Sequence, residues 1–440
     1  MTNASLRWLK AALLLVSGLA GWPAQATLPI QHWQTATGAR VLFVETHDLP
    51  MIDLAVDFAA GASRDTPDKS GAASMTLGLM RAGAGPYSEE AISERLANIG
   101  ADLSGRFDMD RAGYGLRTLS SLREREEALA LFTAVLQAPT FPQQIFEREQ
   151  QRALAGLREA ETRPEVLGDR EFRHLIYGAH PYALRGTGEV DTVAKLRRQD
   201  LLDFYRQHFT ADDAVVSIIG DLTRSEARAI AEQITSGLPR RSQPLPAIPP
   251  VAQLAAPELR RIAHPATQAH ILIGQPGIKR LDPDYFPLFL ANQVLGGGGF
   301  SSRLSQEIRQ KRGYAYSAYS YFNPLLQEGP FQVALQTKKE QAPEALKVAQ
   351  ETLQRFVSEG PTPQELAAAK QNIIGGFALR IDSNKKILEY LSIIGFYRLP
   401  LSYLDDFPDR IEQVTLDQVR DALRRRLHPE RMATVIVAGA

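Results

Sequence analysis

The chain carries the stretch YGLRTLSSLREREEALALFTAVLQAPTFPQQIFEREQQRALAGL at residues 114–157, and repeats it in altered form as FQVALQTKKEQAPEALKVAQETLQRFVSEGPTPQELAAAKQNIIGGF at residues 331–377. Glu127 aligns with Glu344, which is an offset of 344 − 127 = 217 residues. Each copy predicts a strand, a helix with apolar residues at helical spacing, a turn with Pro and a second helix. Solenoid repeats span only roughly 20–50 residues, so this long period indicates two duplicated domains.

The predicted order of elements is similar on both sides of a Pro-rich passage, LPRRSQPLPAIPPVAQLAAPE at residues 238–258, which lacks helical and strand periodicity. We therefore predict an N-terminal domain at 27–237, a linker at 238–258 and a C-terminal domain at 259–440. Runs of strands followed by runs of helices predict an α+β fold, each domain a sheet with helices on one face. The length of 440 residues agrees with this division, because single cores stop growing near roughly 250–300 residues.

Residues 1–26 predict a secretory signal peptide, because Arg7 and Lys10 precede an apolar run that ends in small residues. We expect cleavage before Thr27. A membrane anchor is the alternative, but the apolar run at 11–22 is shorter than the roughly 20 residues that a span needs. The chain has no cysteine, which excludes a lipid-anchored cysteine and a disulfide. We predict a periplasmic protein.

The balance of 50 basic and 50 acidic residues leaves no net charge. Nucleic acid and anionic membrane surfaces are therefore not expected partners.

The segment DKSGAASMTLGLMRAGAG at residues 68–85 predicts a helix made mostly of small residues, with no side chain that can hydrolyse a bond. Ser74 and Gly78 are four apart and share one helical face, which is therefore low and smooth. Two interpretations remain open. The small residues either allow close packing of the helix on a sheet, or they leave empty a face that carries functional groups in related proteins.

The second interpretation follows from a resemblance. Together with GARVLFVETHDLP, AAGASRDTPDKSG, AVVSIIGD and GGGGFSSRLSQEIRQKRGYAYS, the segment resembles the M16 family of zinc peptidases over essentially the whole mature chain. The resemblance implies two homologous domains, each a mainly antiparallel sheet with helices packed on one face. In that family the helix carries H-x-x-E-H, whose histidines hold zinc while the glutamate acts as general base.

The positions that correspond to these zinc ligands and to the general base carry no such groups in this chain. The H-x-x-E-H positions align with Ser74, Leu77 and Gly78, and the third ligand position aligns with Gly156, although Glu159 lies nearby. None of the eight histidines forms the i, i+4 pair typical of a helical zinc site. We therefore predict no metal and no cofactor in this chain.

Gly296, Gly297, Gly298 and Gly299 precede Phe300 and free the backbone for a close approach. A phosphate-binding loop is the rival interpretation, but it is not favoured because the G-x-x-x-x-G-K-[ST] pattern is missing. The run corresponds to the glycine-rich loop of the non-catalytic subunit of mitochondrial processing peptidase, so the resemblance implies that these five residues bind substrate. A tight turn at a helix end explains the glycines nearly as well.

After the glycines, the spacing of Phe300, Leu304 and Ile308 predicts a short helix with one buried stripe and Arg309 just off it. A strand follows. Strict alternation places Tyr319 and Tyr321 on one face and a second group of residues on the other, which comprises Tyr314, Tyr316, Ala318, Ser320 and Phe322.

Arg309 and Tyr316 match the Arg and Tyr that M16 enzymes contribute from their second half to the active site. The resemblance implies that this pair holds the substrate backbone and stabilises the oxyanion. A structural role for an Arg at a helix end and a Tyr in a strand is the alternative.

A chain that keeps this pair and lacks the zinc ligands is typical of a non-catalytic subunit. We predict that it joins a partner chain that bears H-x-x-E-H and zinc, and that the heterodimer cleaves peptides or unfolded polypeptides. The alternative is a non-proteolytic structural or peptide-binding protein of the same fold.

Overall fold

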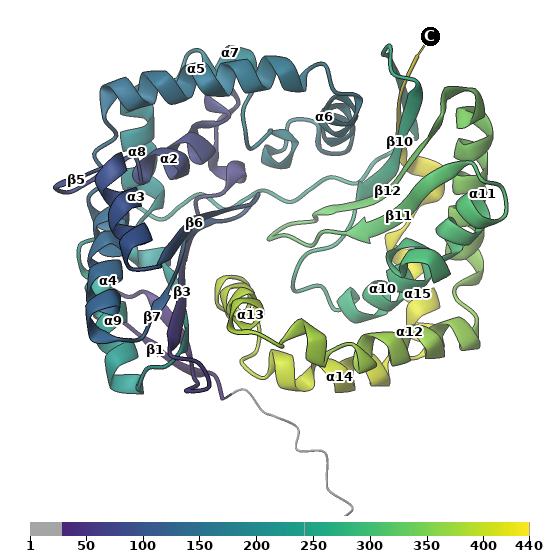
Figure 1. Cartoon of the computed structure of the whole chain (residues 1–440). Coiled ribbons are helices and arrows are strands. Elements are labelled where there is room, and N and C mark those ends of the chain that lie inside the picture. The colour runs from purple at the N-terminus through teal and green to yellow at the C-terminus, as the bar shows by residue number, and fades with distance from the viewer. Residues whose placement is uncertain (1–28, 242, 440) are drawn as a thin grey trace, which may run out of the picture.

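The computed structural model describes residues 29–241 and 243–439 and contains two large β-sheets, one from each half of the chain (Figure 1). The predicted signal peptide at residues 1–26 lies outside the described residues. No helix in the described part of the chain is long and apolar enough to cross a membrane.

The first sheet has six strands in the order β1-β2-β8-β3-β7-β6. Its strands are β1 (Gln31–Gln34), β2 (Arg40–Glu45), β3 (Met51–Phe58), β6 (Asp102–Phe107), β7 (Ala112–Leu119) and β8 (Val215–Gly220). The β2–β8 pair is parallel and the other pairs are antiparallel. A small hairpin of β4 (Gly83–Ala84) and β5 (Tyr87–Ser88) lies outside this sheet.

The second sheet has five strands in the order β11-β12-β10-β13-β9. Its strands are β9 (Glu258–Ala263), β10 (Gln268–Pro276), β11 (Ala315–Phe322), β12 (Pro330–Lys338) and β13 (Ala433–Ala438). Only the β13–β9 pair is parallel. The strands β2-β8-β3-β7-β6 of the first sheet correspond in order to β9-β13-β10-β12-β11 of the second sheet. In each sheet the first pair of this series, β2–β8 or β9–β13, is the parallel one. The prediction of two homologous α+β domains with mainly antiparallel sheets is therefore confirmed.

The helices of the first half are α2 (Ala72–Met80), α3 (Glu89–Asn98), α4 (Leu122–Gln137), α5 (Gln143–Ala160), α6 (Pro164–Tyr177), α7 (Val190–Val193), α8 (Arg198–His208) and α9 (Arg224–Ser236). Those of the second half are α10 (Tyr285–Asn292), α11 (Ala342–Glu359), α12 (Pro363–Gly375), α13 (Asn384–Tyr397), α14 (Tyr403–Gln413) and α15 (Leu416–Arg426). The repeated stretch becomes β7-α4-α5 in one half and β12-α11-α12 in the other. Between α9 and β9, the described residues form no helix or strand.

One helix from each half crosses to the sheet of the other half. Helix α13 packs on β3 and β8 of the first sheet, and α6 packs on β10 and β13 of the second (Figure 1). Each crossing helix carries a glycine at the contact. A Cβ at Gly395 would lie 2.4 Å from Val215 Cγ1, and one at Gly168 would lie 3.4 Å from Val437 Cγ2. The sequence did not predict this exchange, which covers the second face of each sheet.

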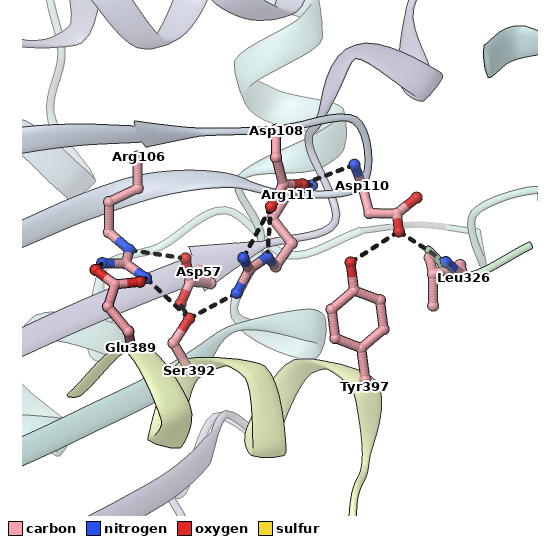
Figure 2. A network of polar contacts seen from close by, with 9 residues as sticks. All are labelled: Asp57, Arg106, Asp108, Asp110, Arg111, Leu326, Glu389, Ser392 and Tyr397. Carbon is pink, nitrogen blue, oxygen red and sulfur yellow. Dashed lines mark hydrogen bonds and ion pairs between the residues drawn. The ribbon is translucent and has the colours of Figure 1, made fainter. Parts of the chain in front are cut away.

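Polar side chains fix α13 on the first sheet (Figure 2). Arg106 donates to both carboxylate oxygens of Glu389 at 2.5 and 2.7 Å, and also contacts Asp57 at 3.3 Å. Ser392 donates to Asp57 and accepts a hydrogen bond from Arg111 at 2.7 Å. Because Asp57 is buried, these contacts compensate for the loss of its hydration.

A second part of the network centres on the buried carboxylate of Asp110. It accepts hydrogen bonds from the Tyr397 hydroxyl at 2.9 Å and from the Leu326 backbone N–H at 2.8 Å (Figure 2). The Tyr182 hydroxyl donates a third hydrogen bond to this carboxylate at 2.9 Å. Its donors come from both halves of the chain. Burial raises the pKa of Asp110 above its ordinary value.

Candidate functional site

The residues that align with the zinc-ligand positions lie at a groove between α2 and α5. Ser74 and Gly78 from α2 and Gly156 from α5 line this groove, which has a volume of about 660 Å³. Leu77 is buried beneath α2, where its backbone carbonyl accepts a hydrogen bond from the Tyr114 hydroxyl. The structure thus brings three of the four aligned positions to one surface and turns the fourth into the core.

The glycines of this groove are not explained by close packing. A Cβ built at Gly78 would meet no atom within 4 Å, and the same holds at Gly156. The interpretation of a smooth face pressed onto a sheet is therefore wrong for these positions. Their lack of side chains instead leaves open space in the groove.

The donor chemistry of these positions does not fit zinc, which takes sulfur, imidazole or carboxylate ligands. Ser74 offers a hydroxyl that already donates to the Gly71 carbonyl at 3.2 Å, and the glycines offer no side chain. Glu159 is exposed on α5 and does not line the groove. Among the described residues, no group of three His, Cys, Asp or Glu side chains is placed to hold a metal ion.

The helical segment that begins with α10 ends at the glycine run. There the backbone turns and passes close to β11. A Cβ at Gly296 would lie 2.3 Å from the Ser320 backbone nitrogen, so only glycine fits there. Gly299 has a φ of +62°, in the left-handed region that favours glycine. A Cβ at Gly298 would lie 2.4 Å from the Gln293 carbonyl oxygen, so glycine is required there as well. The turn interpretation therefore accounts for Gly296, Gly298 and Gly299.

Phe300 does not belong to the buried stripe that its spacing predicted. Leu304 and Ile308 are fully buried, whereas Phe300 is 66% exposed. It lies in a separate 3₁₀ turn, Gly299–Ser301, which precedes the helical segment that carries the other two. Because the chain changes direction at this turn, the spacing of four residues no longer describes one helical face.

Arg309 and Tyr316 lie together, and Phe300 joins them. The Arg309 guanidinium carbon lies 4.7 Å from the centre of the Tyr316 ring and 4.5 Å from that of the Phe300 ring. Tyr316 is 83% exposed. Cation–π contacts of this kind hold a guanidinium in place and leave its N–H donors available. We call these three residues the Arg–aromatic cluster.

The nearest acidic side chain on the same segment is occupied by other partners. Glu307 pairs with Lys311 and Arg312, each at 2.7 Å, and these hydrogen bonds lower the pKa of Glu307. Within the described part of the chain, Arg309 forms no ion pair with a carboxylate. Its positive charge is therefore available for an external oxygen.

A β-bulge in β11 directs Tyr316 outward. The strand register shifts between Ala315 and Ala318, so one residue more than in the partner strand spans this interval. Both alanines are buried although they are three apart, and Tyr316 between them is exposed. The prediction that Tyr316 shares a face with Ala318 is therefore wrong, because a bulge interrupts strict alternation.

The groove and the Arg–aromatic cluster lie in different halves of the molecule. Helix α2 belongs to the half with the first sheet, and β11 belongs to the second sheet (Figure 1). None of the residues that line the groove comes from the second half. The described structure thus presents two separate surfaces.

Arginines of the groove escaped the sequence reasoning. Arg148 and Arg152 lie one turn apart on α5, but Arg81, Arg163 and Arg185 come from other segments, so only the folded chain brings all five together.

Comparison with known proteins agrees with this architecture. Residues 40–180 match the family model described as Insulinase (Peptidase family M16), and residues 195–373 match the one described as Peptidase M16 inactive domain. A crystal structure of the peptidase M16 inactive domain from Pseudomonas fluorescens is 38% identical, covers 94% of this chain and 98% of that chain, and superposes with a TM-score of 0.90.

Two sequence relatives carry contrasting names. A Streptomyces coelicolor protein named uncharacterized zinc protease is 28% identical over 375 residues, which are 83% of this chain and 81% of that protein. The Helicobacter pylori protein named Non-peptidase homolog YmxG is 25% identical over 403 residues, which are 91% of each chain. The repeated sheet order, the two matched models and the 38% identity show that this chain belongs to the M16 peptidase family.

Proposed function

We propose that this chain is the non-catalytic subunit of a periplasmic, heterodimeric M16-type zinc metallopeptidase. In this role Arg309 and Tyr316 hold the backbone of a peptide and stabilise the oxyanion that forms on a partner chain. The partner bears H-x-x-E-H and binds the zinc. The periplasmic location rests on the signal sequence predicted at residues 1–26.

The observation that carries this proposal is the exposed Arg–aromatic cluster in a chain that lacks zinc-ligating side chains at the aligned positions. A guanidinium presents several N–H donors in a planar fork that matches a charged oxygen, and a phenol adds one donor. Donors fixed in advance stabilise developing charge more than flexible ones do. Stacking of Arg309 between two rings provides such fixing.

The names of the relatives support an inactive subunit as well. The Pseudomonas fluorescens structure is described as an inactive domain, and the Helicobacter pylori relative is named a non-peptidase homolog. The second name also favours the alternative function, a structural or peptide-binding protein without proteolysis. The absence of ligand chemistry at Ser74, Gly78 and Gly156 suits both functions, whereas the availability of Arg309 favours the first.

The test is peptide hydrolysis by the mature chain, alone and mixed with an M16 subunit that bears H-x-x-E-H, with zinc measured in the same samples. We expect a metal-free, inert chain and an active mixture. Arg309→Ala should lower the activity of the mixture by about 10²–10³-fold, as loss of an oxyanion donor does. Arg309→Lys should restore only part of it, because an ammonium lacks the planar fork.

Arg228→Ala is the matched control, since Arg228 is exposed on α9 and far in sequence from the cluster. Size-exclusion chromatography reports whether each variant still assembles. Full activity of an assembled Arg309→Ala mixture contradicts the proposed role of Arg309. Zinc binding and cleavage by the lone chain contradict the subunit function, and inertness of the mixture supports the non-proteolytic alternative.

A further inference from the structure

The groove between α2 and α5 is rich in arginine. Seven charged side chains line it, five of them basic and two acidic, so the lining carries a formal charge of 5 − 2 = +3. These side chains are Arg81, Arg148, Arg152, Arg163, Arg185, Glu89 and Glu149. The whole chain has no net charge, so this positive charge is a local feature of the groove.

Two of the arginines are neutralised by close carboxylates. Arg148 pairs with Glu89 and Glu149, each at 2.8 Å, and Arg185 pairs with Glu189 at 3.1 Å. These contacts account for both acidic residues of the lining.

Three arginines remain available for a ligand. Arg152 reaches Glu149 only at 3.8 Å and its side chain is 81% exposed. Arg163 lies 4.0 Å from Glu165, at the limit of an ion pair. Arg81 forms no ion pair with any carboxylate of the described residues. Exposed pairs at such distances contribute little, so a ligand replaces them at low cost.

The uncharged part of the groove lining is mostly apolar. It includes Met75 and Leu79 from α2 and Ala153 and Leu157 from α5. Gly78 is exposed to the open space of the groove, where an added Cβ would meet nothing. The volume of about 660 Å³ lies within the roughly 300–1,000 Å³ of small-ligand sites. A short stretch of extended chain fits this size.

We propose that this groove binds a short acidic segment of a polypeptide, with its carboxylates on Arg81, Arg152 and Arg163 and its apolar atoms on the α2 and α5 lining. Guanidinium groups pair with carboxylates through two parallel hydrogen bonds. The apolar lining favours a peptide over a bare inorganic anion, which has nothing to bury there. The inference rests on the proposed function in one respect, namely that this segment belongs to the peptide substrate.

The experiment is fluorescence anisotropy with short labelled peptides of alternating Glu and Ala, Gln and Ala, or Lys and Ala, titrated with the mature chain alone. The acidic peptide should bind tightest, the basic one weakest, and added salt should weaken acidic binding. The double variant R81Q/R152Q should weaken it at least about tenfold, since hydrogen bonds to charged groups are lost. The single variant R228Q is the control and should leave it unchanged.

A second pair of variants tests the groove without changing charge. Gly78→Leu adds a side chain to the open space and should abolish acidic binding, whereas Gly375→Leu, at another helical glycine with nothing within 4 Å, should not. Circular dichroism checks that both variants fold. Equal affinity for all three peptides, or unchanged binding by R81Q/R152Q, overturns the inference.

Two competitors identify other ligands. If inorganic phosphate or a single-stranded oligonucleotide displaces the acidic peptide at lower concentration than unlabelled peptide does, the site is a general anion site and the inference is wrong. The proposed function fails separately. If the acidic peptide binds but the mixture with the zinc-bearing subunit is inert, only the proposed peptidase function is contradicted. If the mixture is active but the chain binds all three peptides equally, only the inference about the groove is contradicted.

Discussion

At the scale of single residues, glycine has two opposite roles at the surfaces described above. Gly296 allows the backbone to approach Ser320, where a Cβ would lie 2.3 Å from the nitrogen. Gly78 faces space in which a Cβ would meet nothing. The sequence shows the same residue type in both places, and only the packing of neighbouring elements distinguishes a required glycine from a replaceable one.

This difference predicts opposite effects of alanine on stability. Gly296→Ala should lower the free energy of unfolding by about 1–3 kcal/mol or more, because the added methyl group overlaps backbone that cannot move aside. Gly78→Ala should raise it by about 0.5–1 kcal/mol, because alanine restricts the unfolded chain and favours the helix. Urea denaturation measures both. A loss of stability in Gly78→Ala would show that the groove is closed by close packing.

At the scale of elements, the crossing helix α13 explains why buried polar residues occur in the first sheet. Asp57 in β3 and Asp110 before β7 are buried and are hydrogen-bonded by side chains of α13, including Ser392 and Tyr397. Such carboxylates within the core of a sheet would be costly without these partners. The polar network therefore specifies where α13 docks.

Asp110 gives the sharpest test of this docking. Asp110→Ala should lower the free energy of unfolding by about 3–5 kcal/mol, because two buried hydroxyls and one half-buried backbone N–H lose their acceptor. Tyr397→Phe removes one donor and keeps the ring, so it should cost only about 1 kcal/mol. Urea denaturation compares the two. Similar small losses for both variants would contradict the central position of Asp110.

At the scale of the whole molecule, the exchange of α6 and α13 makes each half depend on the other. The face of the first sheet that contacts α13 includes Leu42, Val44, Val215 and Ile219, which share a buried cluster with residues of the second half. A half expressed alone would expose this apolar face to water. Large exposed apolar patches promote association or aggregation.

We therefore expect heat to unfold the chain in one transition that is the same by circular dichroism and by fluorescence. The separate chains 27–237 and 258–440 should bind a hydrophobic dye or aggregate, and should become compact when they are expressed together. The co-expressed pair is the control, because it lacks the linker connection in the same way but restores the contacts between the two halves. Independent, dye-free folding of either half would contradict the dependence.

The sequence by itself determined the duplication and the α+β class, and it showed that the positions aligned with the zinc ligands carry no zinc-ligating side chain. These features are local, since spacing fixes a helix or strand and residue type fixes whether a ligand is present. It also indicated Arg309 and Tyr316, because the motif around them is contiguous.

Only the tertiary structure decided the rest. The bulge beside Tyr316 and the exposure of Phe300 depend on how β11 and the preceding turn meet their neighbours. The arginines of the groove come from separate segments, and the crossing of α6 and α13 joins residues hundreds of positions apart, such as Asp57 and Ser392. Contacts of this kind depend on the surfaces that remain after the local elements form, and no short spacing in the chain encodes them.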